Sequence, residues 1–132
     1  MTRLLVVDDS GEVRRSVCAV LGDLLAGVSF GEAATAGDAL AAFARESWDA
    51  VLLDLSLPDR SGLETLREMR RARPDVPVLV MSFHPQVEYA AAARAHGAAG
   101  YVAKGSPPEE MAAAITAALA SGPDGSPVQG TR

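Results

Sequence analysis

Short apolar runs alternate along the chain with stretches in which apolar residues recur at helical spacing. Continuous apolar runs are typical of strands covered on both faces, whereas the helical spacing is typical of amphipathic helices. The pattern predicts five strands, at residues 4–7, 28–33, 50–53, 76–81 and 100–103. Gly31 and Glu32 interrupt the second run, which predicts that this strand lies at an edge of the sheet.

The predicted helices follow the strands one by one, at residues 13–25, 39–43, 63–69, 87–96 and 111–119. Ser61 and Glu64 have the spacing of a capping box at the start of the third helix. Strict alternation of strand and helix predicts an α/β fold, (βα)5, with a doubly wound parallel sheet and helices on both faces. Residues 1–121 form one predicted domain, and residues 122–132, rich in glycine and proline, are predicted to be a flexible tail or linker stub.

Composition excludes several classes of function. The 132 residues carry 12 basic and 17 acidic side chains, a net charge of −5, which is poorly suited to binding nucleic acid or an anionic membrane. No apolar run is long enough to span a bilayer. Cys18 is the only cysteine, which excludes an internal disulfide and favours a reducing, cytoplasmic compartment.

Polar side chains follow the predicted strands at their carboxyl ends, where open parallel sheets bind ligands. Asp8 and Asp9 follow the first strand, Asp54 the third, Ser82 the fourth and Lys104 the fifth. Two carboxylates about 4 Å apart repel by roughly 4 kcal/mol at an effective dielectric constant of about 20. Three of them predict a bound cation, and their hard oxygen ligands favour Mg²⁺ or Mn²⁺.

Asp54 beside such a cation is suited to act as a carboxylate nucleophile toward a phosphoryl group. Lys104 supplies a positive charge for the incoming phosphoryl oxygens, and Ser82 supplies a hydroxyl donor. Lys104 is also the only lysine in a chain that otherwise uses arginine, which supports a specific role for its compact ammonium.

These residues occur in motifs that resemble a response regulator receiver domain of the CheY-like superfamily. The motifs are LLVVDD at 4–9, VLLDLSLPD at 51–59 followed by Gly62, VLVMS at 78–82 and GAAGYVAK at 97–104. The resemblance covers residues 3–121 and implies a flavodoxin-like sheet with strand order 2-1-3-4-5. It also implies a two-component signalling role, with phosphorylation of Asp54 by a sensor histidine kinase, rather than a turnover enzyme.

The resemblance implies roles for residues around Asp54 as well. It implies that Mg²⁺ or Mn²⁺ is held by Asp9, Asp54 and the backbone carbonyl of Ser56, with Asp8 acting through water. Ser82 and Tyr101 match the positions that switch together when the phosphoryl group arrives, with Lys104 drawn toward it. The switch is expected to reshape the surface of the fourth helix, the fifth strand and the fifth helix, which then binds a partner or a second copy of the chain.

Some positions depart from the family pattern or vary within it. Phe83 stands where the family usually has a small residue, so its ring is expected to narrow access for the phosphodonor or for hydrolytic water. Ser56 and His84 match positions that modulate self-dephosphorylation. The segments around Phe83 and at residues 101–110 resemble receivers of the NarL/FixJ type, which continue into a helix-turn-helix DNA-binding domain. The chain is therefore expected to be either a natural stand-alone receiver or one cut within its linker from a transcription factor.

Other interpretations of these residues remain open from the sequence. One is an aspartyl-phosphate phosphatase of the haloacid dehalogenase class, although Ser56 stands where that class has a second aspartate. Another is a receiver that binds proteins without being phosphorylated, although the complete set of site residues argues against it. Four arginines of the third helical stretch are interpreted as a solvated face: Arg67, Arg70, Arg71 and Arg73.

Overall fold

The computed structural model describes residues 2–83 and 87–121, and strands and helices alternate along them. The elements are β1 Thr2–Val7, α1 Gly11–Leu24, β2 Val28–Ala33, α2 Ala36–Arg45, β3 Ala50–Asp54, α3 Gly62–Ala72, β4 Val78–Ser82, α4 Val87–Ala95, β5 Gly100–Ala103 and α5 Pro108–Ser121. The predicted tail at 122–132 and the residue His84 lie outside the described part. Within that part, no helix combines the length and the apolar character needed to cross a membrane.

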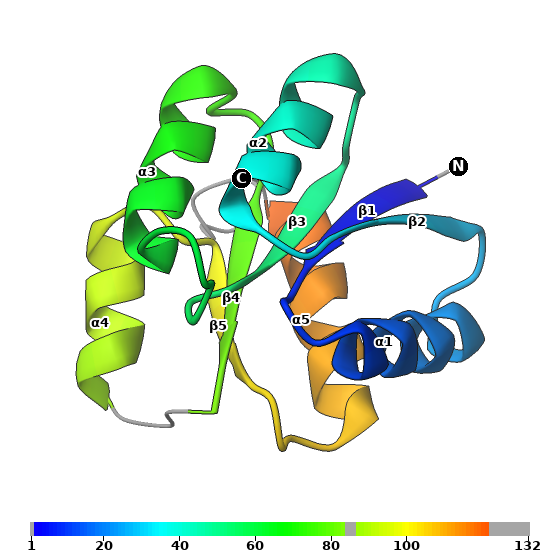
Figure 1. Cartoon of the computed structure of the whole chain (residues 1–132). Helices are drawn as coiled ribbons and strands as arrows, with labels where there is room; N and C mark the ends of the chain where they lie inside the picture. The colour runs from blue at the N-terminus through cyan, green and yellow to red at the C-terminus, as the bar shows by residue number, and fades with distance from the viewer. Residues whose placement is uncertain (1, 84–86, 122–132) are drawn as a thin grey trace.

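The five strands form one parallel sheet in the order β2-β1-β3-β4-β5 (Figure 1). The predicted strand order is therefore confirmed, and β2 lies at an edge as predicted. Val7 of β1 is opposite Leu53 of β3, and Ser82 of β4 is opposite Ala103 of β5. The strands consequently end at nearly the same level, which brings the residues that follow them to one edge of the sheet.

Alternating residues of each strand pack against different helices. Leu5 and Val7 of β1 belong to a buried cluster with side chains of α2, α3 and α4, whereas Leu4 and Val6 belong to a cluster with side chains of α1 and α5. The two sets of helices cover opposite faces of the sheet (Figure 1). Full burial of each aliphatic side chain contributes roughly 1.5–3 kcal/mol, so both faces hold the sheet together.

Trp48 packs against the edge strand β2 at Gly31. A Cβ atom on Gly31 would lie 2.3 Å from Trp48 Cη2, so only glycine leaves room for the indole ring. The indole Nε1 donates to the carbonyl oxygen of Ala42 at 3.0 Å, and the guanidinium of Arg3 lies 4.4 Å from the ring centroid. The glycine that interrupts the strand pattern in the sequence therefore serves the packing of Trp48.

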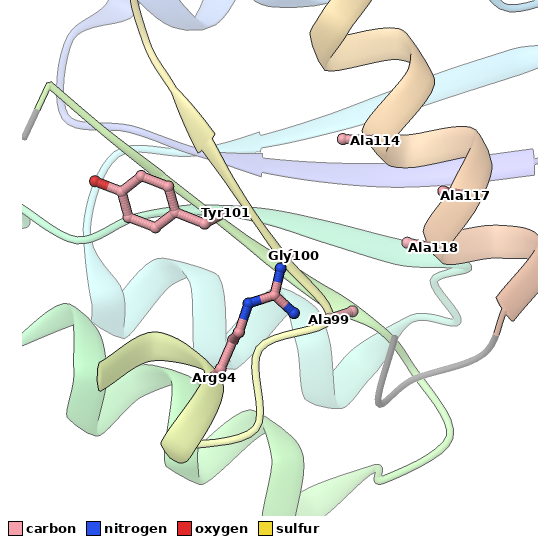
Figure 2. A pocket seen from close by; sticks show the side chains of 7 residues that line it. All are labelled: Arg94, Ala99, Gly100, Tyr101, Ala114, Ala117 and Ala118. Atoms are coloured by element: carbon pink, nitrogen blue, oxygen red, sulfur yellow. The ribbon is translucent and has the colours of Figure 1, made fainter. Parts of the chain in front are cut away.

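The other edge strand, β5, lies between α4 and α5. A depression of about 210 Å³ opens there, lined by Arg94 of α4, by Ala99, Gly100 and Tyr101, and by Ala114, Ala117 and Ala118 of α5 (Figure 2). In Figure 2 the Arg94 side chain extends toward Gly100 and the Tyr101 hydroxyl points away from the α5 alanines. This is the surface that the resemblance to receivers predicts to change on phosphorylation.

The start of the fourth strand and the cap of the third helix differ from the sequence prediction. The fourth strand begins at Val78 rather than at Val76, because the Val76 N–H donates to the carbonyl oxygen of Arg73 in a turn and Pro77 has no N–H to donate. Ser61 is the N-cap of α3, but the predicted capping box is wrong, since the Ser61 side chain makes no capping hydrogen bond. Instead, Thr65 Oγ1 donates to the carbonyl oxygen of Ser61 at 3.0 Å.

The interpretation of the four arginines as a solvated face is wrong for two of them. Arg70 Nη1 donates to the carbonyl oxygen of Pro74 at 2.6 Å. Arg73 donates to the carbonyl oxygens of Glu46 at 2.7 Å and Ala44 at 3.1 Å. These arginines therefore tie the carboxyl end of α3 to the loop before β4 and to the last turn of α2 with the loop that follows it.

Candidate functional site

The site lies at the carboxyl edge of the sheet, where four strands end side by side. Asp8 directly follows β1, Asp54 is the last residue of β3, Ser82 is the last residue of β4, and Lys104 directly follows β5. The ladder continues beyond the strands, because Lys104 N donates to the carbonyl oxygen of Ser82 at 2.9 Å. The structure therefore brings together the residues that the sequence predicted to meet at this edge.

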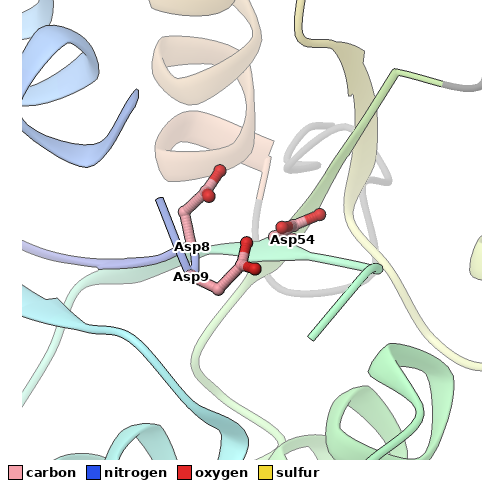
Figure 3. Close-up of side chains that lie close together, drawn as sticks. All are labelled: Asp8, Asp9 and Asp54. Atoms are coloured by element: carbon pink, nitrogen blue, oxygen red, sulfur yellow. The ribbon is translucent and has the colours of Figure 1, made fainter. Parts of the chain in front are cut away.

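Three carboxylates form the acidic cluster of the site. Asp8, Asp9 and Asp54 each offer one oxygen, and these oxygens all lie within 4.8 Å of one another (Figure 3). Asp8 is 0% and Asp54 1% exposed, whereas Asp9 is exposed to solvent. Asp9 is thus the member of the cluster that solvent reaches.

Asp8 and Asp54 are oriented in the same way. Oδ1 of Asp8 accepts from Ser10 N, and Oδ1 of Asp54 accepts from Ser56 N, both at 2.9 Å. Each carboxylate is therefore fixed by the backbone N–H two residues further on, as is common where aspartate begins a turn. This arrangement leaves the Oδ2 atom of each side chain for Lys104.

Lys104 places one ammonium between the two buried carboxylates. Its Nζ lies 2.6 Å from Asp8 Oδ2 and 3.0 Å from Asp54 Oδ2, and 8% of the side chain is exposed. Burial alone would lower the pKa of Lys104, but the carboxylates of Asp8 and Asp54 outweigh it, so the pKa lies above its ordinary value. Lys104 is thus charged and held between the carboxylates of Asp8 and Asp54.

The carboxylate cluster fits a divalent cation. The Oδ2 atoms of Asp8 and Asp54 are buried, and in the described part of the chain neither accepts a hydrogen bond of regular geometry. The cluster contains three carboxylates and the Lys104 ammonium pairs with two of them, so the cluster keeps excess negative charge. Buried hard oxygen atoms with unsatisfied capacity, next to the exposed Asp9, are the kind of ligand set that Mg²⁺ binds.

The remaining predicted residues surround this cluster. Ser56 is exposed and contacts Asp54 through its backbone N–H. Ser82 is 1% exposed at the end of β4. Tyr101 is half-buried and packs against the apolar cluster on the α3 and α4 side of the sheet (Figure 2). Phe83 is 68% exposed, and its ring centroid lies 5.0 Å from Lys104 Nζ.

Two residues that the sequence pattern does not single out also support the site. Arg14 Nη1 donates to the carbonyl oxygen of Asp8 at 2.8 Å, while its Nε donates to Glu32 at 2.9 Å. The carboxylate of Asp59 accepts from the N–H groups of Ala36 and Gly37, each at 2.9 Å, and these bonds lower the pKa of Asp59. Asp59 thereby ties the loop after Asp54 to the first turn of α2, where acidic side chains are favourable.

Gly62 brings α3 close to the backbone beside Asp54. A Cβ atom on Gly62 would lie 2.5 Å from Leu55 Cα, so the helix start and the residue after Asp54 are in direct contact. The glycine that follows the second motif in the sequence is thus explained by this close approach, which fixes the backbone that carries Asp54.

Comparison with known proteins agrees with this geometry. Residues 4–116 match the family described as the response regulator receiver domain. The chain is 35% identical over 115 residues to the response regulator UvrY of Escherichia coli strain K12, covering 87% of this chain and 53% of UvrY. The chain therefore spans about half the length of the curated relatives it matches.

Solved structures show the same fold. A two-component response regulator of the LuxR family from Aurantimonas sp. SI85-9A1 superposes with a TM-score of 0.85 at 32% identity, covering 92% of this chain and 87% of that one. A response regulator from Burkholderia pseudomallei, described with a phosphorylated aspartic acid, a calcium ion and citrate, superposes with a TM-score of 0.80 at 25% identity, covering 90% and 69%. The chain belongs to the response regulator receiver domains of two-component systems, which are signalling domains rather than catalytic enzymes.

Proposed function

We propose that the chain is a phosphorylation-controlled switch that accepts a phosphoryl group on Asp54 from a sensor histidine kinase. The observation that carries this proposal is the position of the Asp54 carboxylate. Its Oδ1 is fixed by Ser56 N, and its Oδ2 faces the Lys104 ammonium without a regular hydrogen bond. A fixed carboxylate beside a cation is suited to form an acyl phosphate.

The oxygen ligands of the acidic cluster support Mg²⁺ or Mn²⁺ as the cofactor. Asp9, Asp54 and the backbone carbonyl of Ser56 would hold the ion, with Asp8 acting through water. A bound divalent cation supplies positive charge that offsets the repulsion between the carboxylates and the incoming phosphoryl oxygens. The Burkholderia response regulator, with its phosphorylated aspartic acid and calcium ion, supports the same pairing of metal and phosphoryl group.

Ser82, Lys104 and Tyr101 are the proposed switch residues. Phosphorylation adds negative charge and acceptor oxygens beside Asp54, which attract the Ser82 hydroxyl and the Lys104 ammonium. Movement of Ser82 leaves room for Tyr101, whose strand forms the floor of the depression between α4 and α5. A new position of Tyr101 alters the surface formed by α4, β5 and α5. Separately, Ser56, Phe83 and His84 modulate how long the phosphoryl group persists on Asp54.

The reshaped surface is proposed to control dimerisation or an output domain. The resemblance to receivers of the NarL/FixJ type supports a transcriptional output, and the 32% identity to the LuxR-family regulator from Aurantimonas is consistent with it. In that arrangement a DNA-binding domain C-terminal to the receiver contacts nucleic acid, and the receiver itself contacts the kinase and a second copy of the chain.

The test is intact-mass measurement after incubation with Mg²⁺ and a small phosphodonor. The unmodified chain is expected to gain one phosphoryl group, and Asp54→Ala is expected to gain none. Asp75→Ala is the matched control, because Asp75 is an exposed aspartate away from the cluster, and it should gain the group normally. Phosphorylation of Asp54→Ala, or no uptake by the unmodified chain, would contradict the proposal.

A further inference from the structure

The loop between β3 and α3, residues 55–61, carries one half of the proposed cation site. Asp54 ends β3 just before the loop, and the backbone carbonyl of Ser56 is the proposed oxygen ligand within it. The other half of the site, Asp8 and Asp9, follows β1 (Figure 3). The geometry around a bound ion therefore depends on how the loop is held relative to the end of β1.

Asp59 holds this loop against the start of α2. Its Oδ1 accepts from Ala36 N and its Oδ2 accepts from Gly37 N, both at 2.9 Å. These N–H groups belong to the first turn of the helix, where the helix has no carbonyl oxygen to offer them. The positive end of the helix dipole also favours the charge of the carboxylate. Asp59 is exposed to solvent, yet both of its oxygens have specific partners on α2.

The same stretch of chain also holds the Asp8 side of the site. Asp8 N donates to the carbonyl oxygen of Ala33, the last residue of β2, at 3.0 Å. Two residues separate Ala33 from Ala36, and these two alanines are 5% and 0% exposed. This short connection therefore joins the backbone at Asp8 to the carboxylate of Asp59, so it sets the spacing between the two halves of the site.

The chain between Ser56 and Asp59 has little freedom to move. The ring of Pro58 fixes its own φ angle and disfavours a helical conformation of Leu57. Leu57 also packs against the apolar cluster on the α2 and α3 side of the sheet. A displacement of Asp59 is therefore transmitted to Ser56 rather than absorbed by the residues between them.

We infer that Asp59 is a positioning residue for the divalent cation, because it holds the Ser56 carbonyl at a fixed spacing from Asp8 and Asp9. The inference rests on the proposed function, which places Mg²⁺ or Mn²⁺ at the acidic cluster. Asp59 is not itself a ligand in this arrangement, since both of its oxygens accept from α2. Without its carboxylate the loop has to be ordered when the ion binds, so the ion binds more weakly.

The experiment measures the dissociation constant of Mn²⁺ for the full chain, from the electron paramagnetic resonance signal of the free ion. Asp59→Ala is expected to raise this constant about fivefold, since ordering the backbone of a single loop residue on binding weakens affinity by a factor of this size. Asp59→Asn keeps one acceptor oxygen for α2 and should have a smaller effect. Urea unfolding of each variant establishes that the titrations are made on the folded chain.

Asp38→Ala is the matched control. Asp38 is exposed in the first turn of α2, so its loss removes the same charge from the same end of the helix. Its carboxylate accepts no hydrogen bond within the described residues, and the dissociation constant should therefore change by less than about twofold. Titrations repeated in about 0.5 M KCl, which screens interactions between exposed charges, should leave the effect of Asp59→Ala intact.

A dissociation constant of Asp59→Ala within about twofold of that of the unmodified chain would overturn the inference. An equal effect of Asp38→Ala would overturn it as well, and so would an effect of Asp59→Ala that disappears in KCl. Failure of the unmodified chain to bind Mn²⁺, or binding that Asp9→Ala leaves unchanged, would instead contradict the cation site of the proposed function.

Discussion

Lys104 and Asp8 come from opposite ends of the chain and form a buried ion pair, with Nζ 2.6 Å from Oδ2. The same ammonium lies 3.0 Å from Asp54 Oδ2, so two carboxylates share one counter-charge. Asp9 adds a third carboxylate to the cluster. The stability of this edge of the sheet therefore depends on how the excess negative charge is balanced.

Replacement of Lys104 by methionine tests this balance. Removal of one partner from a buried ion pair leaves uncompensated charge, and we expect Lys104→Met to lower the free energy of unfolding by about 3 kcal/mol in metal-free buffer. Urea unfolding in EDTA measures the difference. Mg²⁺ should then raise the melting temperature of Lys104→Met more than that of the unmodified chain, because the carboxylates have lost their only ammonium. Arg94→Met is the control: it removes an exposed cation and should have little effect on the free energy of unfolding. Equal stability of Lys104→Met and the unmodified chain in EDTA would disprove the prediction.

The fold could be predicted because the apolar runs show where the strands lie, and the polar residues that follow these runs show where the strands end. The apolar residues of β1, β3 and β4 are continuous because both faces of the sheet are covered, so these strands are visible in the sequence. The arrangement of the site follows from them, since residues after parallel strands must meet at one edge. Once the strands are placed, Asp8, Asp54, Ser82 and Lys104 are placed as well.

Side-chain partners across the chain were harder to predict. Arginine resembles a solvated residue in any helical pattern, yet its long side chain allows Arg70 and Arg73 to reach backbone oxygens of neighbouring loops. Asp59 resembles an ordinary loop residue, and only the folded chain brings α2 to it. The sequence indicated Lys104 as a ligand of a phosphoryl group. In the structure its ammonium contacts Asp8 and Phe83, and these contacts depend on side-chain orientation, which the spacing of residues in the sequence does not determine.

The thiol of Cys18 is predicted to react slowly. Burial in α1, helped by the nearby Glu32 carboxylate and opposed by Arg14, raises the pKa of Cys18 from 9.0 to about 11. Because the thiolate is the reactive form, labelling by a disulfide reagent at pH 8 should be about 100-fold slower than for the unfolded chain in denaturant. Glu32→Gln removes a nearby negative charge and should accelerate labelling of the folded chain. Equal labelling rates for folded and unfolded chains would show that the pKa is not raised.

Asp59 is predicted to make stability depend on acid pH. Its folded-state pKa is lowered, first by the hydrogen bond from Ala36 N and then by that from Gly37 N. A lowered folded pKa contributes stability that is present above the unfolded pKa, about 3.9, and that is lost as pH falls through the folded pKa. Asp59→Asn should therefore be less stable than the unmodified chain at pH 7, and the difference should shrink toward pH 3.

Urea unfolding at both pH values measures this difference for Asp59. Asp75→Asn is the control, because Asp75 is also an exposed loop aspartate, and its stability should follow that of the unmodified chain at both pH values. A stability difference for Asp59→Asn that stays constant from pH 7 to pH 3 would show that the carboxylate charge is not responsible.

Arg73 is predicted to stabilise the end of the molecule opposite the acidic cluster of Asp8, Asp9 and Asp54. Its guanidinium donates to the carbonyl oxygens of Glu46 and Ala44 and lies 5.3 Å from the ring centroid of Phe43. Because the contacts are partly solvated, Arg73→Ala should lower the free energy of unfolding by only about 1 kcal/mol. Arg71→Ala is the matched control, since Arg71 lies in the last turn of α3, two residues before Arg73. Arg71 is exposed and makes no ion pair or hydrogen bond with the described residues, so its loss should change stability by less than about 0.5 kcal/mol. Equal effects of the two substitutions would mean that the contacts of Arg73 add nothing to stability and that the whole arginine face is solvated, as its sequence pattern suggests.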